Sequence, residues 1–177
     1  MNIRSISILA RAALAASLFA PPAAHAATEV FSAKLIGDNE VPPINTAGAA
    51  TFRMEVGSTI TFSITFSGLS TNLFVAHLHF APTKVSGGVM IFLCGGGNQP
   101  ACPAATSGTI TGTITAQNVT GPTAQGINAG DLTSALEAVR DGEAYANMHT
   151  TKFPGGEIRG QVHRADKGNR GDRGDTQ

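Results

Sequence analysis

Short apolar runs alternate along the chain with turns rich in Gly, Pro and Asn. The clearest alternation lies in Thr59–Ser67, where four large apolar side chains share one face of an extended strand and hydroxyl side chains share the other. This pattern predicts that one face packs in a core while the other meets water. Similar runs predict eight strands, over Glu29–Ile36, Ala49–Val56, Thr59–Ser67, Phe74–Phe80, Val89–Cys94, Thr109–Ala116, Glu143–Thr150 and Glu157–His163.

One segment, Ala129–Arg140, has the period of a helix instead. Leu132, Ala135, Leu136 and Val139 recur at i, i+3, i+4 and i+7, and Asp131 stands where a helix cap is expected. About eight short antiparallel strands with one short helix predict an all-β fold, a sandwich or barrel.

The two ends of the chain differ from the middle. Residues 1–26 have a basic start, an apolar run and the small-x-small motif Ala24-His25-Ala26, which predicts a signal peptide. A membrane anchor is the less favoured alternative, because the apolar run is shorter than the roughly 20 residues that span a bilayer. Residues 164–177 are almost free of apolar side chains and predict a disordered polar tail, which leaves one domain over 27–163.

Composition and charge reduce the number of possible functional classes. The chain has 177 residues, 42% hydrophobic and 14% charged, with a formal net charge of +0 and no basic run. These values favour one soluble domain without a membrane span after cleavage, and they argue against a nucleic-acid partner. The predicted signal peptide directs the protein to the periplasm or the cell exterior. There the Gly-rich spacing of Cys94 and Cys102 favours a disulfide between them over a metal or redox role.

Histidines are the main candidates for chemistry. His77 and His79 alternate within Phe74–Phe80, so the strand period puts Phe74, Ala76, Leu78 and Phe80 on the packed face and both imidazoles on the opposite face. If the last two predicted strands lie beside this one, the same period gathers further polar residues on the outward face of the sheet. They are Tyr145, Asn147, His149, Glu157, Arg159 and His163.

Imidazoles in this arrangement suit copper or zinc. We therefore expect a mononuclear site with His77, His79 and His149 as ligands and His163 as a possible fourth, with copper first and zinc second. Tyr145, Asn147, Glu157 and Arg159 would orient the ligands or contact an anion. The alternatives are that the histidines only satisfy backbone groups, and that Glu157 and Arg159 form a solvated ion pair. Glu40–Pro43 and Phe153–Gly156 are interpreted as turns.

Several segments resemble, in order and spacing, the CHRD (chordin) domain over Phe31–Val162. The segments are Leu35–Pro43, Ala76–His79, Gly142–Tyr145, Asn147–Thr150 and Pro154–Gln161. The resemblance implies an immunoglobulin-like or Greek-key β-sandwich in a secreted protein, either bacterial or of the chordin type, without an assigned reaction. Phe80-Ala81-Pro82 departs from the glycine-containing turn expected after the second histidine.

Three functions remain open at this point. The first is an exported binding module for a metal ion. The second is a copper redox enzyme similar to superoxide dismutase, which also has an eight-stranded sandwich with an outward His-x-His strand. The third is a metal-free domain that binds an extracellular protein partner. No serine-hydrolase elbow, phosphate loop or His-Glu-x-x-His motif suggests another chemistry.

Overall fold

The computed structural model describes residues 27–165. The predicted signal peptide over 1–26 and most of the predicted tail, 166–177, lie outside the described residues. The strands are β1 (Glu29–Ile36), β2 (Ala49–Val56), β3 (Ile60–Ser67), β4 (Leu73–Phe80), β5 (Gly88–Cys94), β6 (Gly108–Ile114), β7 (Ala144–Thr150), β8 (Ile158–Gln161) and β9 (His163–Arg164). The helices are α1 (Leu132–Arg140) and the short 3₁₀ turns η1 (Gly37–Asn39), η2 (Ala116–Asn118) and η3 (Thr123–Gln125).

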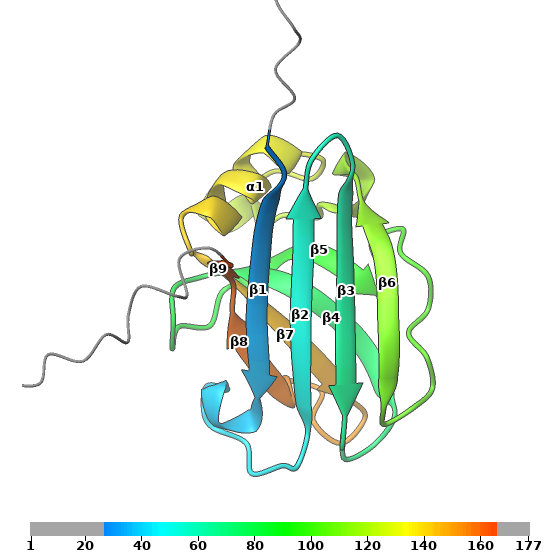
Figure 1. Ribbon diagram of the computed structural model, residues 1–177. Coiled ribbons are helices and arrows are strands. Elements are labelled where there is room, and N and C mark those ends of the chain that lie inside the picture. Colours follow the sequence, from blue (N-terminus) through cyan, green and yellow to red (C-terminus); the bar gives the residue numbers. More distant parts are fainter. Residues whose placement is uncertain (1–26, 166–177) are drawn as a thin grey trace, which may run out of the picture.

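The strands form one continuous antiparallel sheet. Its order is β5-β4-β7-β8-β1-β2-β3-β6, with β9 also paired to β1. The sheet folds back on itself, so that β1, β2, β3 and β6 lie in front of β4, β5, β7 and β8, and α1 lies at one end (Figure 1). Over residues 27–165 the all-β antiparallel class with one α-helix is confirmed, and the sheet is nearly closed. The finer immunoglobulin-like or Greek-key arrangement stays a prediction.

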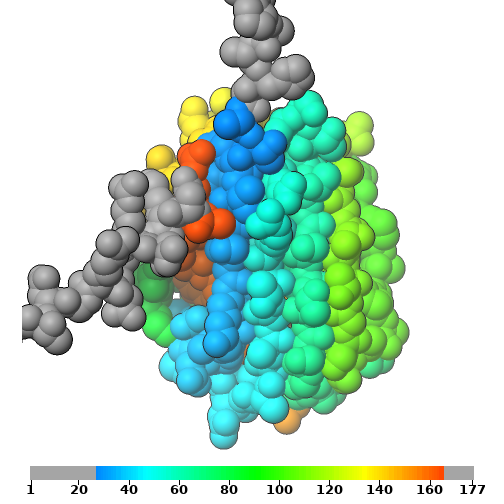
Figure 2. All heavy atoms as spheres, viewed as in Figure 1, coloured from blue at the N-terminus to red at the C-terminus, as the bar shows by residue number. Residues whose placement is uncertain are grey.

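The front layer follows the sequence alternation. Ile60, Phe62, Ile64 and Phe66 of β3 are buried in the core, while Thr61 and Thr65 are exposed. Residues 60–66 of β3 pair in register with β2 on one side and β6 on the other, and Ser67 pairs with β2 alone. Figure 2 shows the outer side of this layer as one continuous face built from β1, β2, β3 and β6. One side of the front layer therefore meets water, as the period-2 pattern predicts.

Two local predictions were wrong. Phe74, expected on the packed face of β4, is 53% exposed. The register between β4 and β7 shifts between Leu73 and Val75, so the alternation is interrupted there and Leu73 joins the core instead. The last predicted strand is also divided, because β8 ends at Gln161 and the chain then pairs with β1 as β9.

The helix begins as its sequence predicts. Asp131 caps α1 by accepting a hydrogen bond from the backbone N–H of Ser134 at 3.0 Å. Ala135 and Val139 of α1 are buried against the core cluster, and Leu132 and Leu136 pack at its edge. A disulfide joins Cys94, the last residue of β5, to Cys102 in the following loop.

We expect the Cys94→Ala/Cys102→Ala variant to lose about 2 kcal/mol of unfolding free energy, because closing this short loop restricts the unfolded chain. Chemical denaturation of the variant and of the oxidised protein measures the difference. The oxidised protein treated with a reductant is the control and should approach the variant. Equal midpoints for all three would contradict the prediction.

Candidate metal centre

The sheet places β4, β7 and β8 side by side, which confirms the adjacency that the sequence argument required. His77 pairs with Asn147, His79 with Tyr145, and Asn147 in turn with Arg159. Ala76, Leu78, Ala146, Met148 and Ile158 all face the hydrophobic core. The side chains between them, including His77, His79 and His149, therefore lie on the other face of these three strands.

That other face is buried, whereas the sequence analysis expected it to point outward. His77 is 6% exposed, His79 8% and His149 6%. Two loops cover this face: the carbonyl of Gly87 in the β4–β5 loop accepts a hydrogen bond from His79, and the carbonyl of Pro154 in the β7–β8 loop accepts one from His149. The Phe92 ring of β5 packs edge-on to His77, with ring centroids 4.7 Å apart. Alternation along a strand shows which side chains share a face, but not whether loops cover that face.

The three imidazoles surround a common point. The His77 ring centroid lies 5.1 Å from that of His79 and 4.8 Å from that of His149, and the other two centroids are 6.0 Å apart. One nitrogen from each ring lies within 4.8 Å of the other two. Metal–nitrogen bonds of about 2.0 Å need nitrogens roughly 3.5 Å apart, so modest ring rotations would bring all three to one ion.

Hydrogen bonds set which nitrogens face the common point. Nδ1 of His79 donates to the Gly87 carbonyl at 3.0 Å, and Nδ1 of His149 donates to the Pro154 carbonyl at 3.0 Å. A carbonyl oxygen only accepts, so Nδ1 carries the proton in both rings and Nε2 keeps a free lone pair. Nε2 of these two histidines and Nδ1 of His77 are buried without a hydrogen-bond partner among the described residues.

Burial also keeps these imidazoles neutral. It lowers the pKa of His77 to about 3, with His149 and His79 adding to the shift, and that of His79 to about 4, with His149 and Arg159 adding to it. Burial lowers the pKa of His149 as well. Only a neutral imidazole nitrogen can donate its lone pair to a metal ion, so all three rings are in the ligating form at neutral pH.

Tyr145 and Arg159 extend the site on one side. The Tyr145 ring stacks on His79 with centroids 4.7 Å apart and planes 5° from parallel, and the Arg159 guanidinium carbon lies 3.4 Å from the Tyr145 ring centroid. The N–H of Gly87 donates to the Tyr145 hydroxyl at 3.3 Å, so Gly87 holds both rings of the stack. A side chain at Gly87 would collide with the Phe80 carbonyl, so this position requires glycine.

Asn147 contacts Glu40, which the sequence analysis interpreted only as part of a turn. Its Nδ2 donates to Oε1 of Glu40 at 2.8 Å, and burial raises the pKa of Glu40 to about 7. Gly156 has a φ of 126°, and a Cβ there would lie 2.8 Å from the Glu40 carboxylate. Glu40–Pro43 and Phe153–Gly156 thus do more than turn the chain, because they carry Glu40 to Asn147 and the Pro154 carbonyl to His149. No signal in the sequence indicated either contact.

Glu157 and His163 are not members of the cluster of three histidines. Glu157 is fully buried and accepts hydrogen bonds from Thr46, Ser70 and Thr150 at 2.6 to 2.8 Å. Burial alone would raise its pKa, but these donors lower it overall. His163 is exposed on β9 and is not part of the cluster of possible metal ligands. The structure therefore brings together three of the four histidines considered.

Comparison with known proteins places the chain in a family. A family model described as the CHRD domain matches residues 31–162. The protein therefore belongs to the CHRD domain family. No curated protein matches the sequence significantly, and no solved structure matches it either.

Acid should destabilise the metal-free protein through these histidines. Unfolded histidine binds a proton near pH 6.5, while folded His77 does so only near 3, so the unfolded state gains protons first as the pH falls. We expect the loss of unfolding free energy between pH 7.5 and 5 to be about 2 kcal/mol smaller in His77→Gln than in the natural protein.

The exposed His163 offers the matched control. Chemical denaturation of His163→Gln at both pH values measures the effect of replacing a histidine outside the buried cluster, and the His77→Gln result is compared with it. A His77→Gln variant with an unchanged pH dependence would show that His77 is not buried as described.

Glu157 should stabilise the fold without contributing to metal binding. Glu157→Gln removes the charge that four hydrogen bonds stabilise, so we expect about 2 kcal/mol less unfolding free energy. The affinity of the folded variant for metal should stay within about twofold of the natural value. A large loss of affinity with unchanged stability would reverse this assignment.

Proposed function

We propose that this protein is an exported CHRD-domain module that binds one copper ion between His77, His79 and His149. The observation that carries the proposal is a cluster of three buried histidines in which one nitrogen of each ring lies within 4.8 Å of the other two, and each ring has a buried nitrogen without a hydrogen-bond partner. A buried polar atom normally has a partner, because desolvating it otherwise costs roughly 1 to 3 kcal/mol. A single cation would satisfy all three.

The ligand set favours copper, with zinc as the second choice. All three donors are imidazole nitrogens, which suit both metals. Affinity for divalent ions at such sites increases from the earlier metals to copper and falls again at zinc. The carbonyls of Gly87 and Pro154 fix two of the rings, which is the usual role of groups that surround a metal ligand.

Family and disulfide are consistent with a periplasmic or extracellular protein. The Cys94–Cys102 bond suits an oxidising compartment, and CHRD domains suggest an extracellular binding role. Within residues 27–165, no helix is both long and apolar enough to cross a membrane.

The burial of the three histidines favours a protein that binds a metal ion over an enzyme that turns over a redox substrate. A superoxide-dismutase-like reaction needs a coordination position that the substrate can reach. Each of the three histidines is at most 8% exposed, so access to the common point is narrow. A metal-free domain that binds an extracellular protein is the remaining alternative, and it leaves the three unpartnered nitrogens without an explanation.

Titration of the purified protein with Cu(I), Cu(II) and Zn(II) tests the proposal. We expect one equivalent of copper to bind and to raise the melting temperature, because a ligand that binds only the folded state stabilises it. The His77→Ala/His79→Ala and His149→Gln variants should each lose at least about 100-fold in affinity. His163→Gln, which alters a histidine outside the cluster, should bind within about twofold of the natural protein.

Two results would reject the proposal. One is the absence of saturable binding by the natural protein, which would leave the imidazoles a structural role and favour a protein partner. The other is equal affinity in the natural protein and both site variants, which would place the metal elsewhere. Superoxide turnover by the copper-loaded protein would establish the redox alternative instead.

A further inference from the structure

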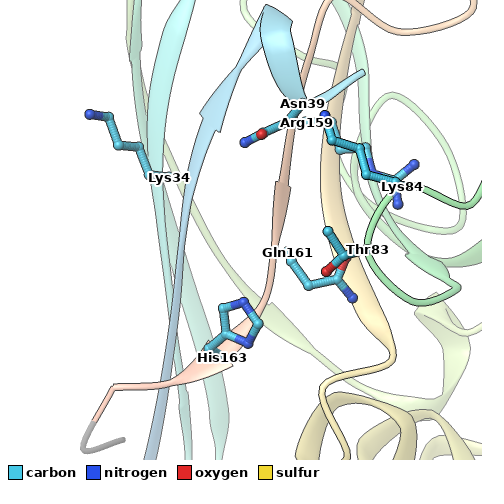
Figure 3. A pocket seen from close by; sticks show the side chains of 7 residues that line it. All are labelled: Lys34, Asn39, Thr83, Lys84, Arg159, Gln161 and His163. Atoms are coloured by element: carbon cyan, nitrogen blue, oxygen red, sulfur yellow. The ribbon is translucent and has the colours of Figure 1, made fainter. Parts of the chain in front are cut away.

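A basic cavity lies beside the histidine cluster, on the far side of the Tyr145 ring. It has a volume of about 320 Å³ and opens between η1, the loop that follows β4, and strands β8 and β9 (Figure 3). Its lining residues are Lys34, Asn39, Thr83, Lys84, Arg159, Gln161 and His163. Three of these side chains carry a permanent positive charge, and none is acidic. We call this space the basic cavity.

Arg159 is a buried cation without an ion-pair partner among the described residues. It is 3% exposed, and its Nη2 donates to the Pro82 carbonyl at 3.1 Å. One face of its guanidinium stacks on the Tyr145 ring. A carbonyl and an aromatic ring orient the guanidinium but do not neutralise it, and the buried Glu40 carboxyl interacts with it electrostatically without forming an ion pair. Buried charges are normally paired more closely than this. Because Arg159 lines the basic cavity, a bound anion there would complete the pair.

Lys84 supplies a second cation, which is exposed to solvent at the edge of the cavity. Its Nζ donates to the backbone carbonyl of Asp38 at 2.7 Å, which holds the ammonium group beside η1 without pairing it with a carboxylate. The backbone of Lys84 has a φ of 64°, a left-handed conformation that is unfavourable for a lysine. Such strain persists where the surrounding structure holds it, often at binding sites.

The remaining lining residues define which groups can reach a ligand. Gln161 uses its side-chain amide to bond the carbonyls of Ala81 and Gly142, so it forms a fixed wall. The Lys34 side chain points away from Arg159 in Figure 3 and contributes only to the surrounding potential. Arg159 and Lys84 are therefore the two cations placed to contact a ligand directly.

We propose that the basic cavity binds a small dianionic oxyanion of the phosphate class, with Arg159 as its anchor and Lys84 as the second cation. A guanidinium presents parallel N–H donors that match two oxygens of such an anion, and a dianion neutralises both charges. The cavity volume of about 320 Å³ also admits a small phosphomonoester. This site stands on Arg159, Lys84 and the cavity, and does not depend on metal binding at the histidines.

Calorimetric titration with inorganic phosphate tests the proposal. The protein is first stripped of metal and transferred to a chelator-free Tris buffer, because phosphate binds metal ions and chelators are themselves polyanions. We expect one saturable site that sulfate competes for and that acetate at the same concentration does not. The affinity should fall as sodium chloride is raised, since salt screens the two cations.

Three variants locate the site. Lys84→Asn removes the charge with a residue that tolerates a left-handed backbone, so the fold should be retained while phosphate affinity falls about tenfold or more. Arg159→Gln should lower the affinity by a similar or larger factor. Lys152→Gln is the matched control, because Lys152 is an exposed lysine outside the cavity, and its affinity should stay within about twofold.

The outcomes separate clearly. No saturation by about 10 mM phosphate, or unchanged affinity in Lys84→Asn, would overturn the proposal, and the second result does not depend on how well Arg159→Gln folds. Acetate binding as tightly as phosphate would overturn the assignment to dianions. Because the protein is metal-free throughout, failure here leaves the histidine site untested, and failure of copper binding leaves this result intact.

Discussion

The structure depends on one constraint, that strands β4, β7 and β8 are buried on both faces. Their apolar residues fill the core, so the polar residues between them must find hydrogen-bond partners inside the protein. Glu157 accepts hydrogen bonds from hydroxyl groups and a backbone N–H, and Asn147 donates one to Glu40. Three imidazole nitrogens and Oδ1 of Asn147 remain without partners, and the three imidazole rings lie together. The candidate metal centre is therefore where most of the unpartnered buried polar atoms of this face gather among the described residues.

The covering loops make the site as much as the strands do. Gly87 accepts from Nδ1 of His79 and donates to the Tyr145 hydroxyl, so one residue fixes the tautomer of a ligand and the position of the ring stacked on it. The Pro154 carbonyl likewise fixes the tautomer of His149. A hydrogen bond at Nδ1 leaves Nε2 as the only free lone pair of each ring. The loops thus direct these two nitrogens toward the common point.

The sequence predicted those features that follow from local periodicity. The alternation in β3, the shared face of His77 and His79, and the Asp131 cap all depend on neighbours within a few positions. Burial of the polar face could not be predicted, because it depends on loops that fold over it from outside the strand. Phe74 is exposed because the register shifts beside it, and the order of apolar and polar residues in the sequence does not indicate such a shift. The contact between Glu40 and Asn147 joins residues 107 positions apart, beyond any local pattern.

Arg159 lies between the two proposed sites, and its positive charge has two opposite effects on metal binding at the histidines. Burial is the main cause of the lowered pKa of His79, and the positive charge of Arg159 adds to it, which favours the neutral imidazole that a metal needs. The same charge disfavours a cation bound near His79, because like charges repel across the Tyr145 ring. An anion in the basic cavity would offset the second effect from the side of Arg159 that faces away from the ring. An exchangeable anion at the fixed guanidinium would therefore make the proposed metal site beside this positive charge more favourable.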